Sequence, residues 1–219
     1  PPPRVQPIDK TQSSNAAVID LAVRAARQGL EAVWHKFRAA ERGRLLMRLS
    51  LKITEHADEL SAIEQRDCGK PTKQARTDAA ALARYFEFYA GACDKLHGET
   101  IPYLEGYSVL TWREPHGVTG HIIPWNYPMQ IFGRSVGAAL AAGNVCVVKP
   151  AEDACLSLLR VAQLATEVGF PAGAINIVPG YGHYVGAPLA RPPGIPPLNL
   201  TRRPPVGARL PPAAPAAPR

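Results

Sequence analysis

Asn126 is the residue whose surroundings first raise a chemical question. It lies in HIIPWNYPMQ, residues 121–130, where most neighbours are apolar and two prolines, Pro124 and Pro128, prevent regular backbone hydrogen bonding. A buried amide is costly unless it is hydrogen-bonded, so we expect a buried amide with a specific partner. An ordinary turn amide is the alternative interpretation.

Two charged residues could bind a ligand at the end of an expected strand. In VVKPAE, residues 147–152, Lys149 and Glu152 follow a short apolar strand, and open α/β sheets bind ligands at the carboxyl ends of their strands. Lys149 could donate to hydroxyls or phosphate. Glu152 could accept from two ribose hydroxyls, which favours NAD because a 2′-phosphate would be repelled. A solvated salt bridge in a loop is the alternative.

A glycine-rich segment follows the next expected strand. GYGHYVG, residues 180–186, has the pattern GxGxxxG, one residue longer than the dinucleotide fingerprint GxGxxG. Gly182 and Gly186 could therefore lie against a phosphate, or they could simply form a turn between a strand and a helix.

The cysteines and histidines form no catalytic pattern. The four cysteines include no CxxC pair, which indicates free thiols in a reducing compartment and no metal site: Cys68, Cys93, Cys146 and Cys155. Cys146 and Cys155 are expected in a core strand and a core helix, without a neighbouring base to activate them. His116 and His121 flank an expected strand, but no carboxylate or cysteine completes a site there.

The first hundred residues are expected to be helical. Ser14 or Asn15 can cap a first helix, after which apolar residues recur at helical spacing. One long helix is predicted near residues 40–66, ended by Gly69 and a following proline. A third helix is predicted at about residues 73–90.

From about Ile101 the pattern becomes that of an α/β fold. Strands are predicted at residues 108–113 and 118–123 and in the segments NVCVVKP and AINIV, and helices at residues 131–142 and 154–168. Apolar strands joined through a helix form a βαβ unit, so an incomplete, Rossmann-like parallel sheet is expected from near residue 118.

The last 33 residues, 187–219, differ from the rest. They hold 11 of the 23 prolines, five arginines and no acidic residue. These arginines supply five of the seven net positive charges, which leaves +2 for the remainder, so no basic face for nucleic acid is indicated. Such a stretch is expected to be disordered or polyproline-like, without strand pairing.

The N-terminal sequence and the apolar runs indicate in which cellular compartment the protein is expected. The N-terminal PPPRVQP has no apolar signal-peptide region, and the longest apolar run, residues 135–148, is too short to span a bilayer. A cytoplasmic protein without a membrane partner is therefore expected.

Several motifs, in order, resemble one known family. EPHGVTGHIIPWNYPMQ, ALAAGNVCVVKPAE and GFPAGAINIVPGYG closely resemble the NAD(P)-dependent aldehyde dehydrogenase superfamily, and ERGRLLMRLSLKITEHADELSAIEQRDCGKP and FYAGACDKLHGETIP resemble its helical N-terminal part. The resemblance covers about residues 15–186. It implies an aldehyde dehydrogenase-like fold, an aldehyde substrate, NAD as cofactor with NADP less favoured, and a homo-oligomer.

The resemblance also implies roles for single residues. Asn126 matches the amide that binds the oxyanion formed when a thiolate attacks an aldehyde, and Lys149 and Glu152 match residues that contact the adenosine ribose. The residues implied to line the cofactor cleft are Ile122, Ile123, Pro124 and Trp125. Residues 108–118 resemble part of the oligomerisation hairpin.

The family mechanism implied here needs residues outside the matched motifs. A cysteine thiolate attacks the aldehyde, hydride passes to the nicotinamide, and a glutamate activates the water that hydrolyses the thioester. That cysteine and glutamate lie beyond position 219 in the family, so a fragment that is inactive alone is expected. In the tail, the resemblance implies a strand followed by a TGSxxxG-like turn. Thr201 and Gly207 match the ends of that turn, while Arg202 and Arg203 replace its Gly and Ser.

The expected organisation has five parts. These are an N-terminal arm (1–14), the helical part of the cofactor-binding domain (15–100), the start of an oligomerisation hairpin (101–118), a Rossmann-like cofactor-binding core (119–186) and a degenerate Pro/Arg-rich tail (187–219). The leading hypothesis is a fragment of an NAD-dependent aldehyde dehydrogenase. A truncated, non-catalytic nucleotide-binding or regulatory subunit, and a Pro/Arg-rich interaction protein, remain as alternatives.

Overall fold

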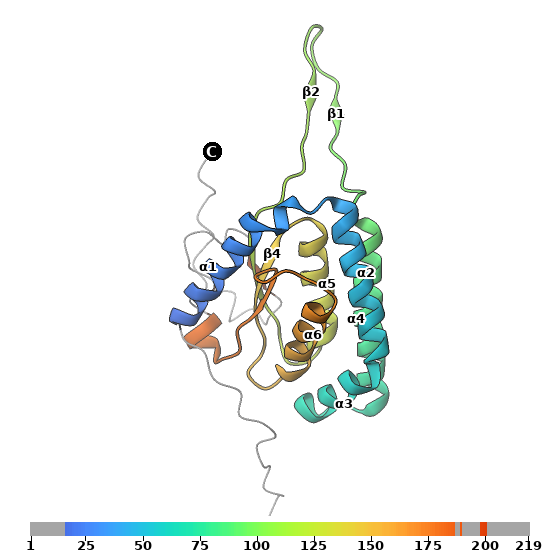
Figure 1. The fold of residues 1–219 in the computed structure, drawn as a ribbon, viewed down its shortest axis with the longest axis vertical. Coiled ribbons are helices and arrows are strands. Elements are labelled where there is room, and N and C mark those ends of the chain that lie inside the picture. The colour runs from blue at the N-terminus through green and yellow to red at the C-terminus, as the bar shows by residue number, and fades with distance from the viewer. Residues whose placement is uncertain (1–15, 187–188, 190–197, 201–219) are drawn as a thin grey trace, which may run out of the picture.

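A parallel sheet forms the centre of this computed structural model, which describes residues 16–186, 189 and 198–200 (Figure 1). In these ranges the strand order is β5–β4–β3–β6, with β3 at Val118–Ile122, β4 at Val145–Lys149, β5 at Ile175–Ile177 and β6 at Leu198–Leu200. Both β3 and β4 are buried along their whole length, as central parallel strands are. The predicted βαβ unit is confirmed.

Helices cover the two faces of this sheet. α1 (Ala16–Ala32) lies on one side, and α5 (Pro128–Ala141) and α6 (Leu156–Glu167) lie on the other (Figure 1). α2 (Ala39–Glu55), α3 (Ala57–Cys68) and α4 (Thr72–Ala92) form an outer helical layer against α5 and α6. A short 3-10 helix, Trp34–Lys36, joins α1 to this layer.

The outer layer is pressed closely against α5. Phe86 of α4 and Phe132 of α5 lie 6.2 Å apart between ring centroids. A Cβ atom at Gly133 would lie 3.1 Å from Leu82 and from Tyr85, so the small residue lets the two helices approach. The start of α5 is thereby held against α4.

The single long helix predicted for residues 40–66 is wrong, because it divides at His56. There the backbone (φ −102°, ψ 17°) leaves the helical region, so that α2 and α3 run in different directions. The apolar stripe continues across the break from Ile53 to Leu60, which is why periodicity alone did not show it. Gly69, at φ 69°, ends α3 as predicted.

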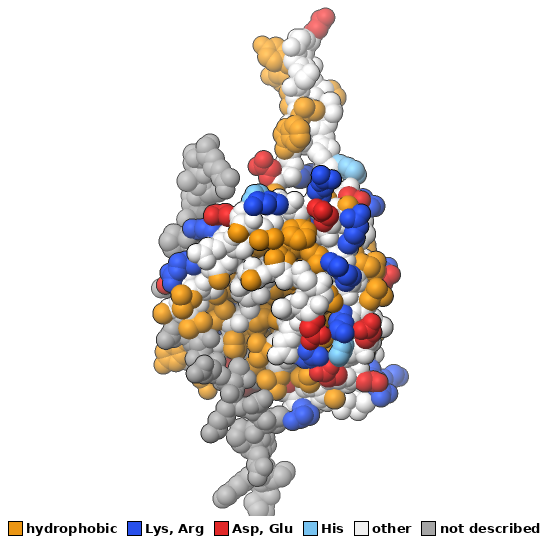
Figure 2. Space-filling model, viewed as in Figure 1, with side chains coloured by type: hydrophobic (Ala, Val, Ile, Leu, Met, Phe, Trp, Pro, Cys, Tyr) orange, Lys and Arg blue, Asp and Glu red, His pale blue; other side chains and the backbone are white. Residues whose placement is uncertain are grey.

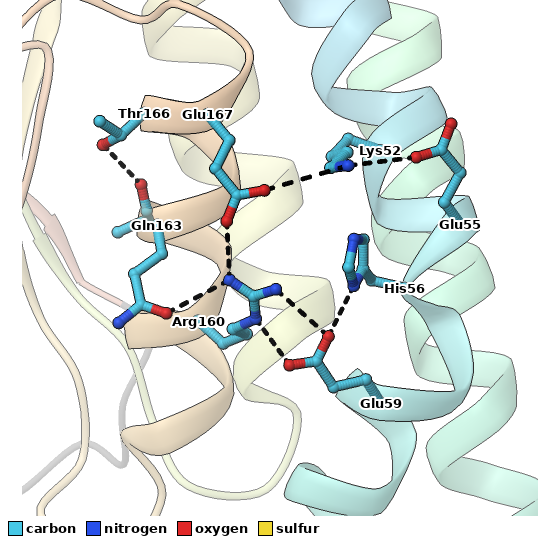
Figure 3. A network of polar contacts seen from close by, with 9 residues as sticks. Lys52, Glu55, His56, Glu59, Arg160, Gln163, Thr166 and Glu167 are labelled. Atoms are coloured by element: carbon cyan, nitrogen blue, oxygen red, sulfur yellow. Dashed lines mark hydrogen bonds and ion pairs between the residues drawn. The ribbon is translucent and has the colours of Figure 1, made fainter.

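A surface network joins both sides of that break to α6 (Figure 3). Arg160 donates to Glu59 (2.7 Å) and Glu167 (3.0 Å), and His56 Nδ1 lies 2.6 Å from the same Glu59 carboxylate. Lys52 of α2 lies 4.0 Å from Glu167. Exposed pairs such as these contribute little individually, so the network orients the helices more than it stabilises them.

A narrow hairpin projects from the body of the fold (Figure 1). β1 (Thr100–Ile101) pairs antiparallel with β2 (Val109–Leu110), so the strand predicted at residues 108–113 is much shorter than expected. The hairpin carries exposed aromatic side chains, visible as hydrophobic surface on the projection in Figure 2: Tyr103, Tyr107 and Trp112.

The described part of the tail corrects one expectation. Residues Leu198–Leu200 form β6, which pairs with β3 through the register Gly120↔Leu198 and Ile122↔Leu200. The proline-rich composition predicted no strand there, whereas the family resemblance implied a strand before the turn at Thr201. Three consecutive non-proline residues retain their backbone N–H groups, and these are enough for a short strand. Thr201, Arg202, Arg203 and Gly207 lie outside the described residues, as do the caps expected at Ser14 and Asn15.

Candidate functional site

The carboxyl ends of β3 and β4 bring together two of the predicted segments. The strands are parallel and in register from Val118↔Val145 to Ile122↔Lys149. The ladder continues one residue further, because the Ile123 N–H donates to the Lys149 carbonyl at 2.9 Å. The segment that carries Asn126 and the segment that carries Lys149 therefore leave the sheet side by side.

Lys149 is the last residue of β4 and is fully buried, which differs from its expected place beyond the strand. Its ammonium donates to Glu152 Oε2 at 2.7 Å, while the Glu152 side chain remains 37% exposed. A buried ammonium needs a charged or polar partner, and this carboxylate supplies one. The salt bridge of the alternative interpretation exists, but its lysine is not solvated.

The segment PWNYP forms the connection from β3 to α5. Pro128 is the first residue of α5, where its missing N–H costs no hydrogen bond, and Tyr127 is the N-cap, with its carbonyl accepting from the Ile131 N–H at 3.0 Å. The helix thus begins three residues earlier than predicted. Both ends of the connection are held by backbone hydrogen bonds.

Asn126 does not lie in a buried setting. It is exposed, as are Trp125 (58%) and Tyr127 (41%), so the expectation of a buried amide is wrong for this chain. The apolar neighbours that suggested burial are divided: Ile122 and Ile123 belong to the sheet and are buried, whereas the aromatic residues face outward. The amide is therefore presented at the edge of the sheet.

The glycine-rich segment lies beside this edge. Gly182–Gly186 form a π-helical turn after β5 rather than a simple turn. A Cβ atom at Gly186 would lie 4.0 Å from Ile122 Cδ1, which places this turn against the end of β3. Five predicted positions therefore converge on one edge: Ile122, Asn126, Lys149, Glu152 and Gly186.

Two neighbours of the PWNYP segment were not predicted. The Lys70 ammonium lies 4.8 Å from the centroid of the Tyr127 ring, and Gln130 donates to Asp78 of α4 at 2.7 Å. The available signal was GKP, residues 69–71, which the sequence analysis used only to end a helix. Periodicity does not show that this lysine meets a segment nearly sixty residues later.

The cysteines have the inert character expected of them. Burial raises the pKa of Cys146 and of Cys68 to about 12, and burial also raises the pKa of Cys93. None of the four cysteines is joined to another by a disulfide bond. A thiol with a raised pKa is a poor nucleophile at neutral pH, so none of these three is activated.

His121 lies inside β3 rather than beside it, and only 2% of it is exposed. Its Nε2 lies 2.9 Å from Thr119 Oγ1, and burial lowers its pKa to about 4. In the ranges that the structure describes, no group of His, Cys, Asp and Glu is arranged to hold a metal ion. In the same ranges, no helix has the length and apolar character needed to cross a membrane.

Comparison with known proteins matches this chain to one protein family. The family model of the aldehyde dehydrogenase family matches residues 1–217. Hydroxyisobutyraldehyde dehydrogenase of Mycolicibacterium austroafricanum is 43% identical over 196 residues, which is 90% of this chain and 39% of that protein. Aldehyde dehydrogenase [NAD(P)+] 2 of Saccharomyces cerevisiae is 41% identical over 207 residues, which is 94% of this chain and 41% of that protein.

Solved structures show the same arrangement. A protein assigned as an aldehyde dehydrogenase from Burkholderia cenocepacia is 70% identical with a TM-score of 0.86, covering 88% of this chain and 41% of that one. PnpE in complex with nicotinamide adenine dinucleotide is 42% identical with a TM-score of 0.84, covering 87% of this chain and 39% of that one. The chain thus spans about two fifths of the length of these relatives, and the α/β fold class is confirmed.

Proposed function

This chain belongs to the aldehyde dehydrogenase family, and we propose that it forms the cofactor-binding portion of an enzyme that oxidises an aldehyde to a carboxylate with NAD. The observation that carries the proposal is the convergence of Asn126, Lys149 and Glu152 on the carboxyl edge of the parallel sheet. Open α/β sheets bind nucleotides at this edge. The expected five-part organisation of the chain belongs to the same proposal.

The residues at the edge fit a dinucleotide. Lys149 supplies a donor and Glu152 a partly exposed acceptor 2.7 Å away, and such a pair suits two adjacent ribose hydroxyls. Gly182 and Gly186 would leave room for the cofactor beside Ile122, and the segment Ile122–Trp125 would line the same side. The Glu152 carboxylate would repel a 2′-phosphate, which favours NAD over NADP.

Asn126 would act on the substrate rather than on the cofactor. The exposed amide N–H groups can donate to an aldehyde oxygen as it becomes an alkoxide, and one such donor contributes about 3–4 kcal/mol to transition-state stabilisation. Its position between two backbone-anchored ends limits how far it can move. NAD, when bound, supplies the acceptor for the hydride.

Calorimetric titration of the chain with NAD and with NADP tests the cofactor site. We expect NAD to bind more tightly, Lys149→Ala to weaken both, and Glu152→Gln to reduce the preference for NAD. Glu87→Gln, at an exposed glutamate of α4 that pairs with Arg84, is the matched control and should change neither affinity. Absence of NAD binding, or an unchanged preference in Glu152→Gln, would count against the site.

Activity of the complete protein tests the role of Asn126. Asn126→Ala should lower kcat with aldehyde by about a hundred- to a thousandfold, because the loss of one oxyanion donor has that effect. The KM for NAD should change little. A kcat within a few fold of the parent would remove Asn126 from the proposed mechanism.

The projecting hairpin is the proposed contact between copies of the chain. Its exposed Tyr103, Tyr107 and Trp112 are large apolar surfaces that a second copy would cover. Trp112→Ser should shift the complete protein to a smaller species in analytical ultracentrifugation, and an unchanged mass would count against this contact. The absence of a disulfide among the four cysteines supports the cytoplasm as the proposed location.

A further inference from the structure

A lysine with two carboxylate partners lies behind the PWNYP segment. Lys70, in the short connection between α3 and α4, donates to Glu64 at 2.6 Å and also to Asp78. Both carboxylate side chains are fully buried, and the lysine side chain is 10% exposed. Gln74 completes the cluster by donating to Asp78 at 2.7 Å.

The lysine keeps its charge in this setting. Burial acts to lower the pKa of Lys70, but the hydrogen bonds to Asp78 and Glu64 outweigh it, so the pKa is raised. Burial raises the pKa of Glu64, against the opposing effect of Lys70. A buried ammonium between two carboxylates is held in one place, because any displacement would leave charges without partners.

This cluster contacts the PWNYP segment at two points. The Lys70 ammonium faces the Tyr127 ring at 4.8 Å, within the range of a cation–π interaction. Gln130, in the first turn of α5, donates to Asp78 at 2.7 Å. The N-cap residue and the first turn of α5 are therefore both bound to the same buried group of charges.

Asn126 depends on these neighbours for its position. It is exposed, and its side chain makes no hydrogen bond to another of the described residues. On one side Ile123 is held by the sheet, through its bond to Lys149, and on the other side Tyr127 is held by α5 and Lys70. The two fixed ends leave only Pro124, Trp125 and Asn126 between them, so loosening either end frees the amide.

We propose that Lys70 is a positioning residue: through Asp78 with Gln130, and through the Tyr127 ring, it holds the PWNYP segment so that Asn126 stays aligned with the oxyanion. The role of Asn126 in this statement rests on the proposed function. The statement that Lys70 holds the segment does not rest on the proposed function, and it can be tested on the chain itself.

Acrylamide quenching of Trp125 fluorescence measures how firmly the segment is held. A Trp112→Phe background removes the other exposed tryptophan, and Trp34 is fully buried. The main variant, the charge-free variant, combines Lys70→Met with Glu64→Gln and Asp78→Asn. These changes remove all three charges and leave none unpaired. Gln130→Ala is the milder second variant, and it keeps every charge.

Both variants should show a higher quenching constant than the background, with a cooperative unfolding transition retained. Lys70→Arg alone preserves the charge, so its quenching constant should equal that of the background. Lys95→Met, at an exposed lysine that pairs with its neighbour Asp94, is the matched control and should have no effect. Unchanged quenching in the folded charge-free variant and in Gln130→Ala would overturn the proposal.

Steady-state kinetics of the complete enzyme tests the link to Asn126. We expect the charge-free variant to lower kcat by about ten- to a hundredfold, less than loss of the donor itself, without changing the KM for NAD. In an Asn126→Ala background the same variant should cause no further loss of kcat. An equal loss in both backgrounds would overturn the positioning role.

The two measurements separate the two proposals. If the complete protein with its natural residues oxidises no aldehyde, the proposed function fails, and the quenching constants still decide whether Lys70 holds the segment. If it is active but quenching does not respond to the charge-free variant, the positioning role fails and the proposed function stands.

Discussion

His121 should make the stability of the fold sensitive to pH. The Thr119 hydroxyl has one hydrogen, which it donates to the Val145 carbonyl at 3.0 Å, so its oxygen accepts from His121 Nε2–H. This assigns the proton of the neutral ring to Nε2. The Nδ1 atom is buried and has no hydrogen-bond partner among the described residues, so protonation there would place an unpaired charge in the sheet.

The size of the effect follows from the lowered pKa of His121. Burial lowers this pKa from 6.5 to about 4, so the unfolded chain binds a proton at higher pH than the folded chain does. The resulting contribution to stability is fully present above pH 6.5, is lost progressively as the pH falls from 6.5, and is gone once the pH has fallen through 4. The free energy of unfolding should fall by about 2 kcal/mol at pH 5, and by about 3 kcal/mol at the acid limit.

Urea unfolding followed by circular dichroism measures this loss. The comparison is the natural chain against His121→Gln, whose amide can still donate to Thr119 but does not titrate. Between about pH 7.5 and about pH 5 the natural chain should lose about 2 kcal/mol more than the variant does. Other groups titrate in both proteins and cancel in the difference. Parallel loss in the two proteins would refute the reasoning.

Three further predictions concern the packing around the site. Gly173→Ala should cost about 2 kcal/mol or more in urea unfolding, because φ is 86° and a Cβ atom would lie 2.5 Å from a carbonyl of α1. Gly69→Ala, at φ 69° with open space, should cost about 1 kcal/mol, and equal costs would contradict the steric argument. Asp67→Ala should lower the free energy of unfolding by about 1–2 kcal/mol, because the Asp67 carboxylate accepts from the first N–H of α6 at 2.7 Å. An Asp67→Asn variant that is no more stable than Asp67→Ala would argue against this cap. Leu82→Ala should lower the free energy of unfolding by about 2–5 kcal/mol, and a loss below 1 kcal/mol would mean that α4 and α5 repack around the site.

Local chemistry determined much of the fold from the sequence. The strands at residues 118–122 and 145–149 lie where alternation with helices predicted them. The second begins with the run VCVV, which is the apolar pattern of a buried parallel strand. The stop at Gly69 was also predicted, because only glycine readily adopts the left-handed conformation there. The break at His56 was not, since the helical stripe continues through it.

The candidate site was predicted unevenly for a related reason. Lys149 and Glu152 are three residues apart, so a short segment contained the information for their pairing. The exposure of Asn126 could not be inferred from apolar neighbours, because the backbone sends the isoleucines into the sheet and the aromatic side chains outward. The pairing of Lys149 with Glu152 was thus predictable and the exposure of Asn126 was not, because the exposure depends on where the chain turns after β3.

The sequence by itself determined the family resemblance, the parallel sheet and the residues at its carboxyl edge, because each depends on a short run of residues with its own periodicity or motif. Only the tertiary structure decided that Lys70 meets Tyr127 and that Gln130 meets Asp78. These contacts join residues more than fifty positions apart. They form because α4 packs against α5, and no local pattern records which side chains two packed helices bring together.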